Sequence, residues 1–371
     1  MKHLIRILVA ATILTALSAC EKDKVTPSSG NDTVPVDPSD TIPVNPGDTV
    51  PPEDTVTASF AIVLNEGNLG ANNASVSRFN PATGDIDNQW FDNANHRGLG
   101  NQAQDMIAYG SKVYITVTES NSLEVLNPQS GLSQRVDMGN RRPRSIAADG
   151  GKLYITCYNP CCVVRVDTAS LQIEATCPLG QFYPEGIAIA QGKAFVASSY
   201  QGSNYDNKLY VVDLGTFANP EYITVGMNLS NVKKVNDNKI IVSWIGNYND
   251  IPSGSAIIDA TSHQITLTGE ALQKMDVYNG KVYGYSVEYD EYWNETNSWK
   301  IINADGSVEA FPFTVSLDAN AYGININPAN GDFYITSSDY STNGDVYCFT
   351  PSGTRRFKVE AGAIPSKVLF L

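Results

Sequence analysis

The chain has 371 residues, of which 42% are hydrophobic and 17% are charged, and 39 acidic residues outnumber 25 basic ones, for a net charge of −14. From Ala58 onward the balance is 31 acidic against 21 basic residues. Nucleic acids and anionic membrane surfaces are bound through clustered Lys and Arg, so this composition argues against both as partners.

The first 20 residues, MKHLIRILVAATILTALSAC, have the layout of an export signal. Lys2 and Arg6 precede an apolar run over 7–17 that is too short to be a stable membrane span. The run ends in Leu-Ser-Ala-Cys, which resembles a bacterial lipobox. We therefore expect a signal peptide over 1–19 and a lipidated Cys20 at the mature N-terminus. An ordinary signal peptide with a chance cysteine is the alternative.

Residues 20–57 are rich in Pro, Asp, Thr and Ser, and Asp-Thr-(Val/Ile)-Pro recurs three times, at residues 32, 40 and 48. With so few large apolar residues, the segment cannot offset the entropy lost on ordering. Its prolines favour extended polyproline II conformations, which reach on the order of 100 Å at about 3.1 Å per residue. We expect a disordered tether that holds the following domain away from a membrane.

Within residues 58–371 one short phrase keeps returning, as in SKVYITVTE at 111–119, GKLYITCYN at 151–159 and GKVYGY at 280–285. Its aligned aromatic or aliphatic position recurs at steps of 40 to 51 residues, at Tyr114, Tyr154, Phe195, Ile241, Tyr283 and Tyr334. Each repeat divides into four short β-type segments separated by Gly, Asn, Asp and Pro. This pattern predicts an all-β propeller with four-stranded antiparallel blades.

The two ends of the repeat series complement each other. The first unit consists of FAIVLNEGN, ASVSRFNP and DNQWF and lacks an innermost strand, whereas the chain ends in IPSKVLFL, a lone innermost strand. We expect the last strand to pair into the first blade, which closes a ring of seven blades and removes exposed sheet edges.

Four of the five cysteines after Cys20 fall within about twenty residues, and an exported protein meets an oxidising environment. If Asn159-Pro160 is a tight turn, Cys157 faces Cys162, and Cys161 falls near Cys177. We expect two local disulfides, with Cys348 unpaired. A vicinal Cys161–Cys162 bridge remains open, as does a zinc site, although no histidine lies nearby.

In such a propeller, the loops between second and third strands and those between successive blades emerge on one face. Here these loops are long and rich in Tyr, Trp, Asn and Gln, whereas the turns of the opposite face are short. Aromatic rings and amides at the mouth of a central channel suit a large neutral ligand with many hydrogen-bonding groups.

Catalytic signals are sparse in this sequence. His96 and His263 are the only histidines after residue 57, and the sequence has no nucleophile motif, metal-spaced cluster or phosphate loop. A cation bound by YDEYWNE at 289–295, or a metal centre contacted by His96, are weaker interpretations than ordinary loops. We expect no intrinsic cofactor and no metal site.

The lipobox, the Pro/Asp-rich tether and the phrases GKLYITCYN, RVDTASL and PEGIAIAQGKAFV are similar to those of the YncE-like propeller lipoproteins of Bacteroidetes. Over 58–371 the chain resembles in particular the BtuG-like group, which captures vitamin B12. The resemblance implies capture of a corrinoid such as cobalamin at the cell surface and its delivery to a TonB-dependent outer-membrane transporter. We also expect a monomeric propeller that contacts the outer membrane only through its lipid anchor.

Loop position and side-chain chemistry, rather than the resemblance, give the candidate ligand-binding residues. The expected ring contacts are Tyr200, Tyr205, Trp244, Tyr248, Tyr289, Trp293 and Tyr340. The expected polar contacts are Asn121, Asn159, Asn204, Asn247, Arg141, Arg142 and His96. The same loops would also serve a glycan-binding accessory lipoprotein or a protein-binding scaffold. A propeller lyase or hydrolase is a further alternative, with Glu66, Asp105 or Glu185 at the mouth.

Overall fold

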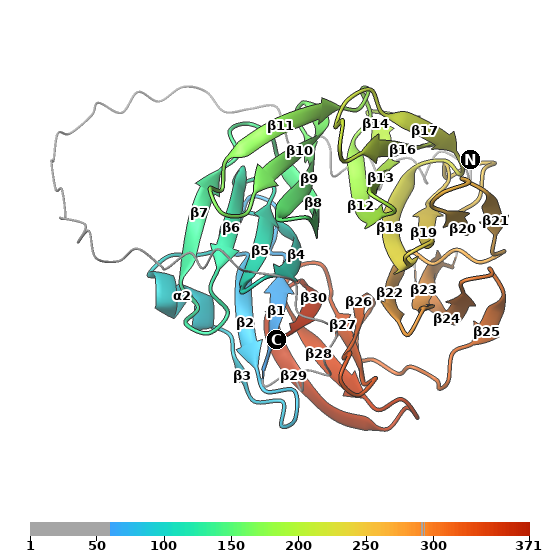
Figure 1. The fold of residues 1–371 in the computed structure, drawn as a ribbon. Coiled ribbons are helices and arrows are strands. Elements are labelled where there is room, and N and C mark those ends of the chain that lie inside the picture. Colours follow the sequence, from blue (N-terminus) through green and yellow to red (C-terminus); the bar gives the residue numbers. More distant parts are fainter. Residues whose placement is uncertain (1–59, 291, 293) are drawn as a thin grey trace, which may run out of the picture. The chain divides into compact units, whose positions relative to one another are not determined.

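A computed structural model describes residues 60–290, 292 and 294–371. These residues form seven four-stranded antiparallel sheets arranged as the blades of a ring (Figure 1), so the predicted fold is confirmed. The predicted signal peptide, Cys20 and the tether over 20–57 lie outside the described residues.

Each blade runs from an innermost strand at the ring axis to an outermost strand at the rim. The innermost strands are β30 (Pro365–Phe370), β4 (Ala103–Tyr109), β8 (Pro143–Asp149), β12 (Pro184–Ala190), β18 (Leu229–Asn236), β22 (Lys274–Tyr278) and β26 (Ala321–Ile326). The second strands are β1 (Ala61–Asn65), β5 (Lys112–Val117), β9 (Lys152–Tyr158), β13 (Lys193–Ser198), β19 (Lys239–Trp244), β23 (Lys281–Tyr289) and β27 (Phe333–Ser337).

The third strands are β2 (Ser75–Phe79), β6 (Ser122–Leu126), β10 (Cys161–Asp167), β16 (Lys208–Asp213), β20 (Gly254–Asp259), β24 (Glu295–Asn303) and β28 (Asn343–Phe349). The outermost strands are β3 (Ile86–Asp87), β7 (Ser133–Asp137), β11 (Ile173–Pro178), β17 (Glu221–Thr224), β21 (Ile265–Leu267), β25 (Val308–Ala310) and β29 (Arg355–Ala363). A small hairpin of β14 (Tyr200–Gln201) and β15 (Asn204–Tyr205) projects from the fourth blade, between β13 and β16.

Ring closure occurs as the sequence predicts. Strand β30, from the C-terminus, pairs antiparallel with β1, and Val368 lies opposite Val63. The Leu371 amide extends this ladder by donating to the Phe60 carbonyl at 3.0 Å. The first blade is therefore built from both ends of the described chain.

The outer part of the first blade differs from the prediction. DNQWF was expected to be a strand, but β3 is only two residues long and helix α2 begins at Trp90 and ends at Asn95. Trp90 and Phe91 are buried in the core between the first and second blades, and the Asn95 amide donates to the Gly131 carbonyl at 2.8 Å. Adjacent positions of a strand face opposite sides, so a helical turn is what buries both aromatic rings in one cluster.

The repeated phrase of the sequence is explained by packing between blades. The described residues form seven apolar clusters, and each lies between two neighbouring blades. Alternate residues of a strand face opposite neighbours: in β1, Ile62 packs toward the second blade and Val63 toward the seventh. The aligned aromatic of each repeat packs toward the following blade, as Tyr114, Tyr154 and Tyr334 do.

The longest repeat step, 51 residues, has a packing reason. The connection over 311–320 places Phe311 and Phe313 against Phe333, with ring centroids 5.1 and 5.4 Å apart. These rings fill the space between the sixth and seventh blades, so the extra length contributes to the core.

The two faces of the ring differ as expected. We call the face with the second-to-third-strand loops the mouth face, and the opposite one the far face. Several far-face turns have only two residues, and at 150–151, 191–192 and 279–280 both have positive φ. This geometry favours Gly and Asn and matches the twist of a tight hairpin.

The cysteine prediction was partly wrong. Cys157 does lie opposite Cys162, but all five cysteines within the described residues are free thiols. Cys177 lies opposite Val163 rather than beside Cys161. Neither expected bridge is formed.

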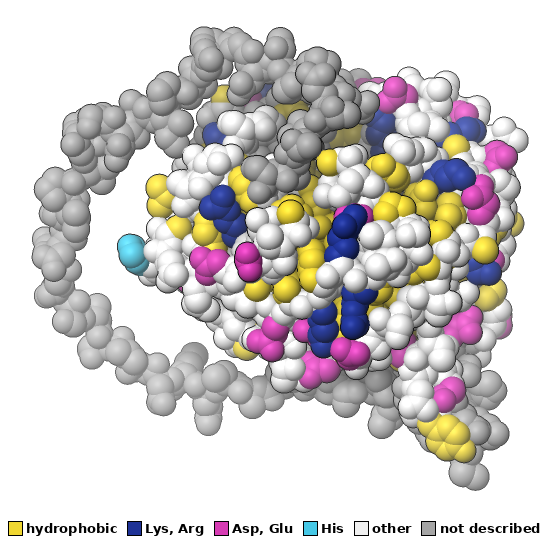
Figure 2. Space-filling view, turned by 90° about the horizontal axis from the view of Figure 1, so that it is seen from below, with side chains coloured by type: hydrophobic (Ala, Val, Ile, Leu, Met, Phe, Trp, Pro, Cys, Tyr) yellow, Lys and Arg dark blue, Asp and Glu magenta, His cyan; other side chains and the backbone are white. Residues whose placement is uncertain are grey.

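On the side of the molecule shown in Figure 2, basic side chains lie beside acidic ones, with apolar side chains between them. Many of the described basic residues are ion-paired, such as Lys358 with Asp318 and Asp345.

Within residues 60–290, 292 and 294–371, no helix is long and apolar enough to cross a membrane.

Candidate functional site

A cavity of about 630 Å³ runs along the ring axis and is lined by residues from all seven innermost strands. The first residues of these strands lie at the mouth end, because the loops that precede them emerge on the mouth face. They present the side chains of Gln104, Arg144, Glu185, Ser230, Lys274, Tyr322 and Ser366. The cavity entrance is therefore polar and charged.

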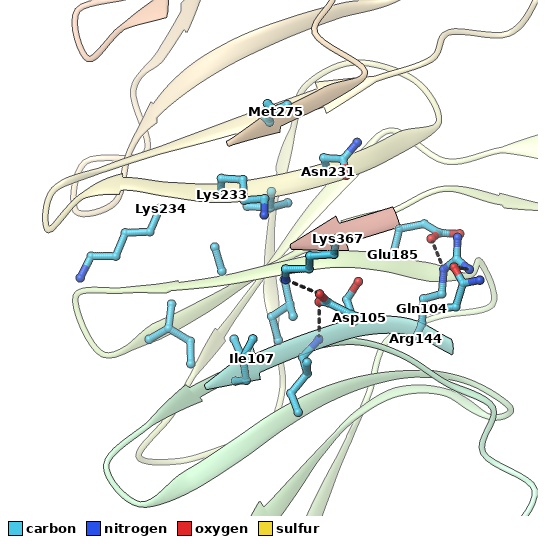
Figure 3. A pocket seen from close by; sticks show the side chains of 18 of the residues that line it. Gln104, Asp105, Ile107, Arg144, Glu185, Asn231, Lys233, Lys234, Met275 and Lys367 are labelled. Atoms are coloured by element: carbon cyan, nitrogen blue, oxygen red, sulfur yellow. Dashed lines mark hydrogen bonds and ion pairs between the residues drawn. The ribbon is translucent and has the colours of Figure 1, made fainter. Parts of the chain in front are cut away.

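A continuous hydrogen-bonded chain follows part of this entrance, and Figure 3 shows its central residues Gln104, Arg144 and Glu185. It runs through Tyr322, Glu66, Gln104, Arg144, Glu185 and Tyr158. At its centre, the Arg144 Nε donates to Glu185 Oε2 at 2.8 Å, and the same guanidinium donates to the Gln104 amide oxygen. Each Glu in the chain accepts a hydrogen bond from a tyrosine hydroxyl, so both carboxylates are held in place.

Burial determines how these groups ionise. It raises the pKa of the Tyr158 and Tyr322 hydroxyls well above the ordinary value of 10.0, so both stay neutral. Burial opposes the charge of Arg144, but Glu185 beside it outweighs that effect and the pKa of Arg144 is raised. The chain thus joins one half-buried cation to fixed anions and neutral hydroxyls.

A second polar level lies deeper in the cavity. Lys367 on β30 donates to Asp105 Oδ1 at 2.6 Å, and the other carboxylate oxygen accepts from the Ile146 amide of the third blade at 3.1 Å. Similarly, Asn325 accepts from the Val368 amide at 2.7 Å. Side chains of the inner strands therefore link neighbouring blades around the axis.

At the mouth, eight tyrosines come from five of the seven blades. We call this set the tyrosine collar: Tyr158, Tyr183, Tyr200, Tyr205, Tyr248, Tyr289, Tyr322 and Tyr340. Its members come from strand ends and mouth-face loops, and consecutive members contact or approach one another around the opening.

One half of the collar belongs to the third and fourth blades. Tyr158 stacks on Tyr183 with ring centroids 4.5 Å apart, and Tyr183 meets Tyr200 edge-on at 5.4 Å. Tyr200 lies opposite Tyr205 in the β14–β15 hairpin, and Tyr205 contacts Tyr248 at 6.1 Å. The short hairpin therefore extends the row of rings toward the fifth blade.

The other half belongs to the fifth, sixth and seventh blades. Burial, and then the nearby Tyr205, Tyr200 and Tyr289, raise the pKa of Tyr248. The hydroxyls of Tyr289 and Tyr340 both donate to Glu295 at 3.4 Å. Tyr340 then meets Tyr322 edge-on at 5.6 Å, and Tyr322 leads back into the entrance chain. The rings and the entrance chain together encircle the mouth.

Five of the collar tyrosines were among the predicted ring contacts: Tyr200, Tyr205, Tyr248, Tyr289 and Tyr340. Tyr248 and Tyr340 are 53 and 48% exposed, so about half of each residue's surface is accessible to a partner. Sequence reasoning missed the other three. Tyr158 ends a repeat strand, and Tyr183 and Tyr322 flank the starts of innermost strands; these fixed repeat positions are the signal that could have found them.

Two predicted contacts instead maintain the loop of the fifth blade. The Trp244 indole lies against Gly226 and Gly254 and donates to the Pro252 carbonyl at 3.2 Å. The Asn247 side-chain oxygen accepts three backbone amides, from residues 249, 250 and 251. Both side chains are therefore engaged in local structure.

Four predicted residues cluster beside the third blade. Asn121 accepts from the Arg142 amide at 3.0 Å, and Arg141 donates to the Met138 carbonyl at 2.9 Å, so both hold the connecting loop. Asn159 occupies the exposed turn between β9 and β10. Arg142 pairs with Glu119 and lies over the Tyr158 ring at 5.5 Å, which places it beside the collar.

The remaining predictions fall elsewhere. His96 is the exposed C-cap of α2, beside the outer strands of the first two blades and away from the collar. Asn204 is exposed in the β14–β15 hairpin, and Trp293 lies outside the described residues. Asp290, in the loop considered for a cation, instead accepts the backbone amides of Tyr292 and Asn294. Within the described part of the chain, no group of three or more His, Cys, Asp or Glu side chains is placed to hold a metal ion.

No family model matches this chain, and no curated protein matches its sequence. Among solved structures, it is similar to a quinoprotein alcohol dehydrogenase-like protein from Bacteroides thetaiotaomicron VPI-5482, with a TM-score of 0.64 and 13% identity over 84% of this chain and 78% of that one. Hydrazine synthase from Kuenenia stuttgartiensis gives a TM-score of 0.53 and 20% identity over 64% and 74%. A streptogramin B lyase gives 0.51 and 12% over 83% and 89%. At these identities the likeness extends to the propeller fold alone.

Proposed function

We propose that this protein captures a large neutral ligand at the tyrosine collar without converting it, and that the ligand is a corrinoid such as cobalamin. The observation that carries the proposal is the collar itself, a set of eight tyrosines from five blades on the face where the axial cavity opens. Aromatic rings with a polar tip combine apolar contact area with hydrogen bonding.

The chemistry of a corrinoid matches this arrangement. The macrocycle offers an apolar face, which the half-exposed rings of Tyr248 and Tyr340 can cover. Its rim carries amides, which pair with neutral hydroxyls and with amide and guanidinium groups. Burial raises the pKa of the collar tyrosines Tyr200, Tyr248 and Tyr289, so these hydroxyls remain donors and acceptors at neutral pH.

The expected cellular role follows from the N-terminal sequence. A lipid on Cys20 and a long tether would hold the propeller at the surface of the outer membrane. A monomer so anchored would pass its ligand to a TonB-dependent transporter. The mouth face is the face we expect to meet that transporter, since it holds the ligand.

A non-catalytic role is favoured because the carboxylates of the cavity are already engaged. Glu66 and Glu185 accept hydrogen bonds from their neighbours in the entrance chain, and Asp105 is paired with Lys367. A propeller enzyme is the second candidate, since these carboxylates converge on one cavity and one structural neighbour is a lyase. In that case Glu185→Gln would abolish turnover while binding persists.

Isothermal titration of the full chain with cyanocobalamin tests the proposal. We expect saturable binding and a rise in melting temperature; at a free ligand concentration of about 100 Kd, binding adds about 2.7 kcal/mol to the free energy of unfolding. Tyr248→Ala and Tyr340→Ala should each weaken binding at least tenfold. Tyr222→Ala is the matched control, since Tyr222 is 57% exposed but lies on the outermost strand β17.

The outcomes separate the candidates. Absence of heat and of any thermal shift at excess corrinoid would refute the corrinoid proposal. Binding of oligosaccharides on a glycan array that is lost in Tyr340→Ala would identify a glycan-binding accessory protein. Product formation detected by mass spectrometry would identify an enzyme.

A further inference from the structure

Two lysines in the axial cavity have no ionic partner in the described structure. Among the described residues, Lys233 on β18 makes no hydrogen bond or ion pair through its ammonium group, and Lys274 on β22 only lies over the Tyr322 ring at 4.6 Å. Both side chains line the cavity, and Figure 3 shows Lys233 reaching into it from β18.

The neighbouring carboxylates already accept hydrogen bonds, and two of them are ion-paired. Asp105 is paired with Lys367 at 2.6 Å, and Asp276 accepts the Ile326 amide at 2.9 Å. At the entrance, Glu185 is paired with Arg144, and Glu66 accepts from Gln104 and Tyr322. The two lysine ammonium groups are therefore left to water or to a ligand.

The lysines also disfavour each other's charge. Burial lowers the pKa of Lys274, and the nearby Arg144 and Lys233 lower it further, against Glu66 and Glu185. Burial likewise lowers the pKa of Lys233, and Lys367 lowers it further, against Asp276 and Asp105. Two desolvated like charges that face one cavity are stabilised together by an anion placed between them.

We propose that Lys233 and Lys274 form a binding site for a carboxylate or phosphate group inside the axial cavity, below the tyrosine collar. The Lys274 ammonium group lies over the Tyr322 ring of the entrance chain, and Lys233 extends into the cavity near Lys367 and Asp105, so an anion between them bridges the two levels. The anion is either a free small molecule or an acidic group of the ligand held at the collar. The site does not depend on which ligand the collar binds.

The first arm of the test uses free anions. The full chain is titrated calorimetrically with inorganic phosphate and with citrate at constant ionic strength. We expect saturable binding that weakens at least tenfold in Lys233→Met and in Lys274→Met and is retained in Lys233→Arg. Lys112→Met is the control, because Lys112 begins β5 on the far face, outside the cavity lining. Melting temperatures show whether each variant is folded.

The second arm asks whether the anion belongs to the collar ligand. Cobalamin carries a phosphodiester and cobinamide lacks it, so a preference for cobalamin that disappears in Lys233→Met assigns the anion to the bound corrinoid. If no corrinoid binds, the function proposed above fails, and the free-anion arm alone decides this site. Binding that is unchanged in both Met variants, or failure of both arms, overturns the inference.

Discussion

Lys367, on the closing strand β30, donates to Asp105 on β4 at 2.6 Å, so the last strand is bonded to the second blade as well as to the first. Asp105 also accepts from the Ile146 amide of the third blade. The pair therefore joins three blades at the point where the ring closes. Both side chains are about one-fifth exposed, so solvent screens the pair only partly.

We expect Lys367→Met to lower the free energy of unfolding by about 1.5–3 kcal/mol, because it removes a charge-assisted hydrogen bond and leaves Asp105 unpaired. Urea denaturation measures this change. Lys112→Met removes a lysine from the far face and should change stability by less than about 0.5 kcal/mol. Equal effects of the two substitutions would show that the pair contributes nothing to closure.

The fold was predictable because one physical requirement repeats along the chain. Each blade buries both of its faces against its neighbours. Apolar side chains that point alternately to the two faces, and an aligned aromatic or aliphatic residue such as Tyr114 or Tyr154, therefore recur along the chain. The C-terminal segment IPSKVLFL has no partner strands of its own, and the first unit lacks an innermost strand, so the pairing of the two was predictable. At Trp90 and Phe91, two adjacent aromatic residues are buried on the same side by a helix, and the prediction of a strand was wrong there.

The candidate site was only partly predictable, since loop chemistry does not tell which side chains a loop uses for itself. Tyr248 and Trp244 lie in the same connection, yet Tyr248 is half exposed in the collar while Trp244 packs against two glycines. The entrance chain was missed for another reason. Gln104, Arg144 and Glu185 belong to three separate innermost strands, and only ring closure brings them together.

Glu124 on β6 provides a test of pH dependence. Its carboxylate is fully buried and pairs with Arg97 at 2.7 Å and Arg135 at 2.6 Å. Burial raises the pKa of Glu124, but the hydrogen bonds from Arg97, Ser133 and Arg135 outweigh it, so the folded-state pKa lies below the ordinary 4.5. The resulting stability is present above pH 4.5 and is lost as pH falls through the lower folded-state value.

Glu124→Gln should therefore lower the free energy of unfolding by about 3 kcal/mol at neutral pH, because two arginines lose their anion. The difference from the wild type should shrink as the pH falls below 4.5. Glu309→Gln is the control, because its pair with Lys281 is exposed and is screened by solvent. A difference that stays constant from pH 7 to strongly acidic pH would contradict the ion-pair explanation.

Gly226 and Gly98 test the packing of the fifth-blade loop. A Cβ on Gly226 would lie 2.0 Å from the Trp244 ring, whereas one on Gly98 would have nothing nearer than the Asn72 carbonyl oxygen at 4.0 Å. Neither glycine has a positive φ, so backbone strain does not confuse the comparison. We expect Gly226→Ala to cost about 1–3 kcal/mol of unfolding free energy. Gly98→Ala should be neutral or slightly stabilising. Similar melting temperatures for both variants would contradict the tight packing of Trp244.

The cysteines of the third blade give the last prediction. Cys161 is partly exposed, whereas Cys157, Cys162 and Cys177 are fully buried. We expect iodoacetamide to modify Cys161 in the folded protein and the other three only after unfolding, with peptide mass mapping as the readout. Burial raises the pKa of the Cys161 thiol above its ordinary 9.0, and the thiolate is the reactive form, so the rate should still rise with pH beyond that value. If cysteine peptides resist labelling in denaturant until a reductant is added, a disulfide is present. Cys157 and Cys162, which face each other across the hairpin, are then the pair expected to form it.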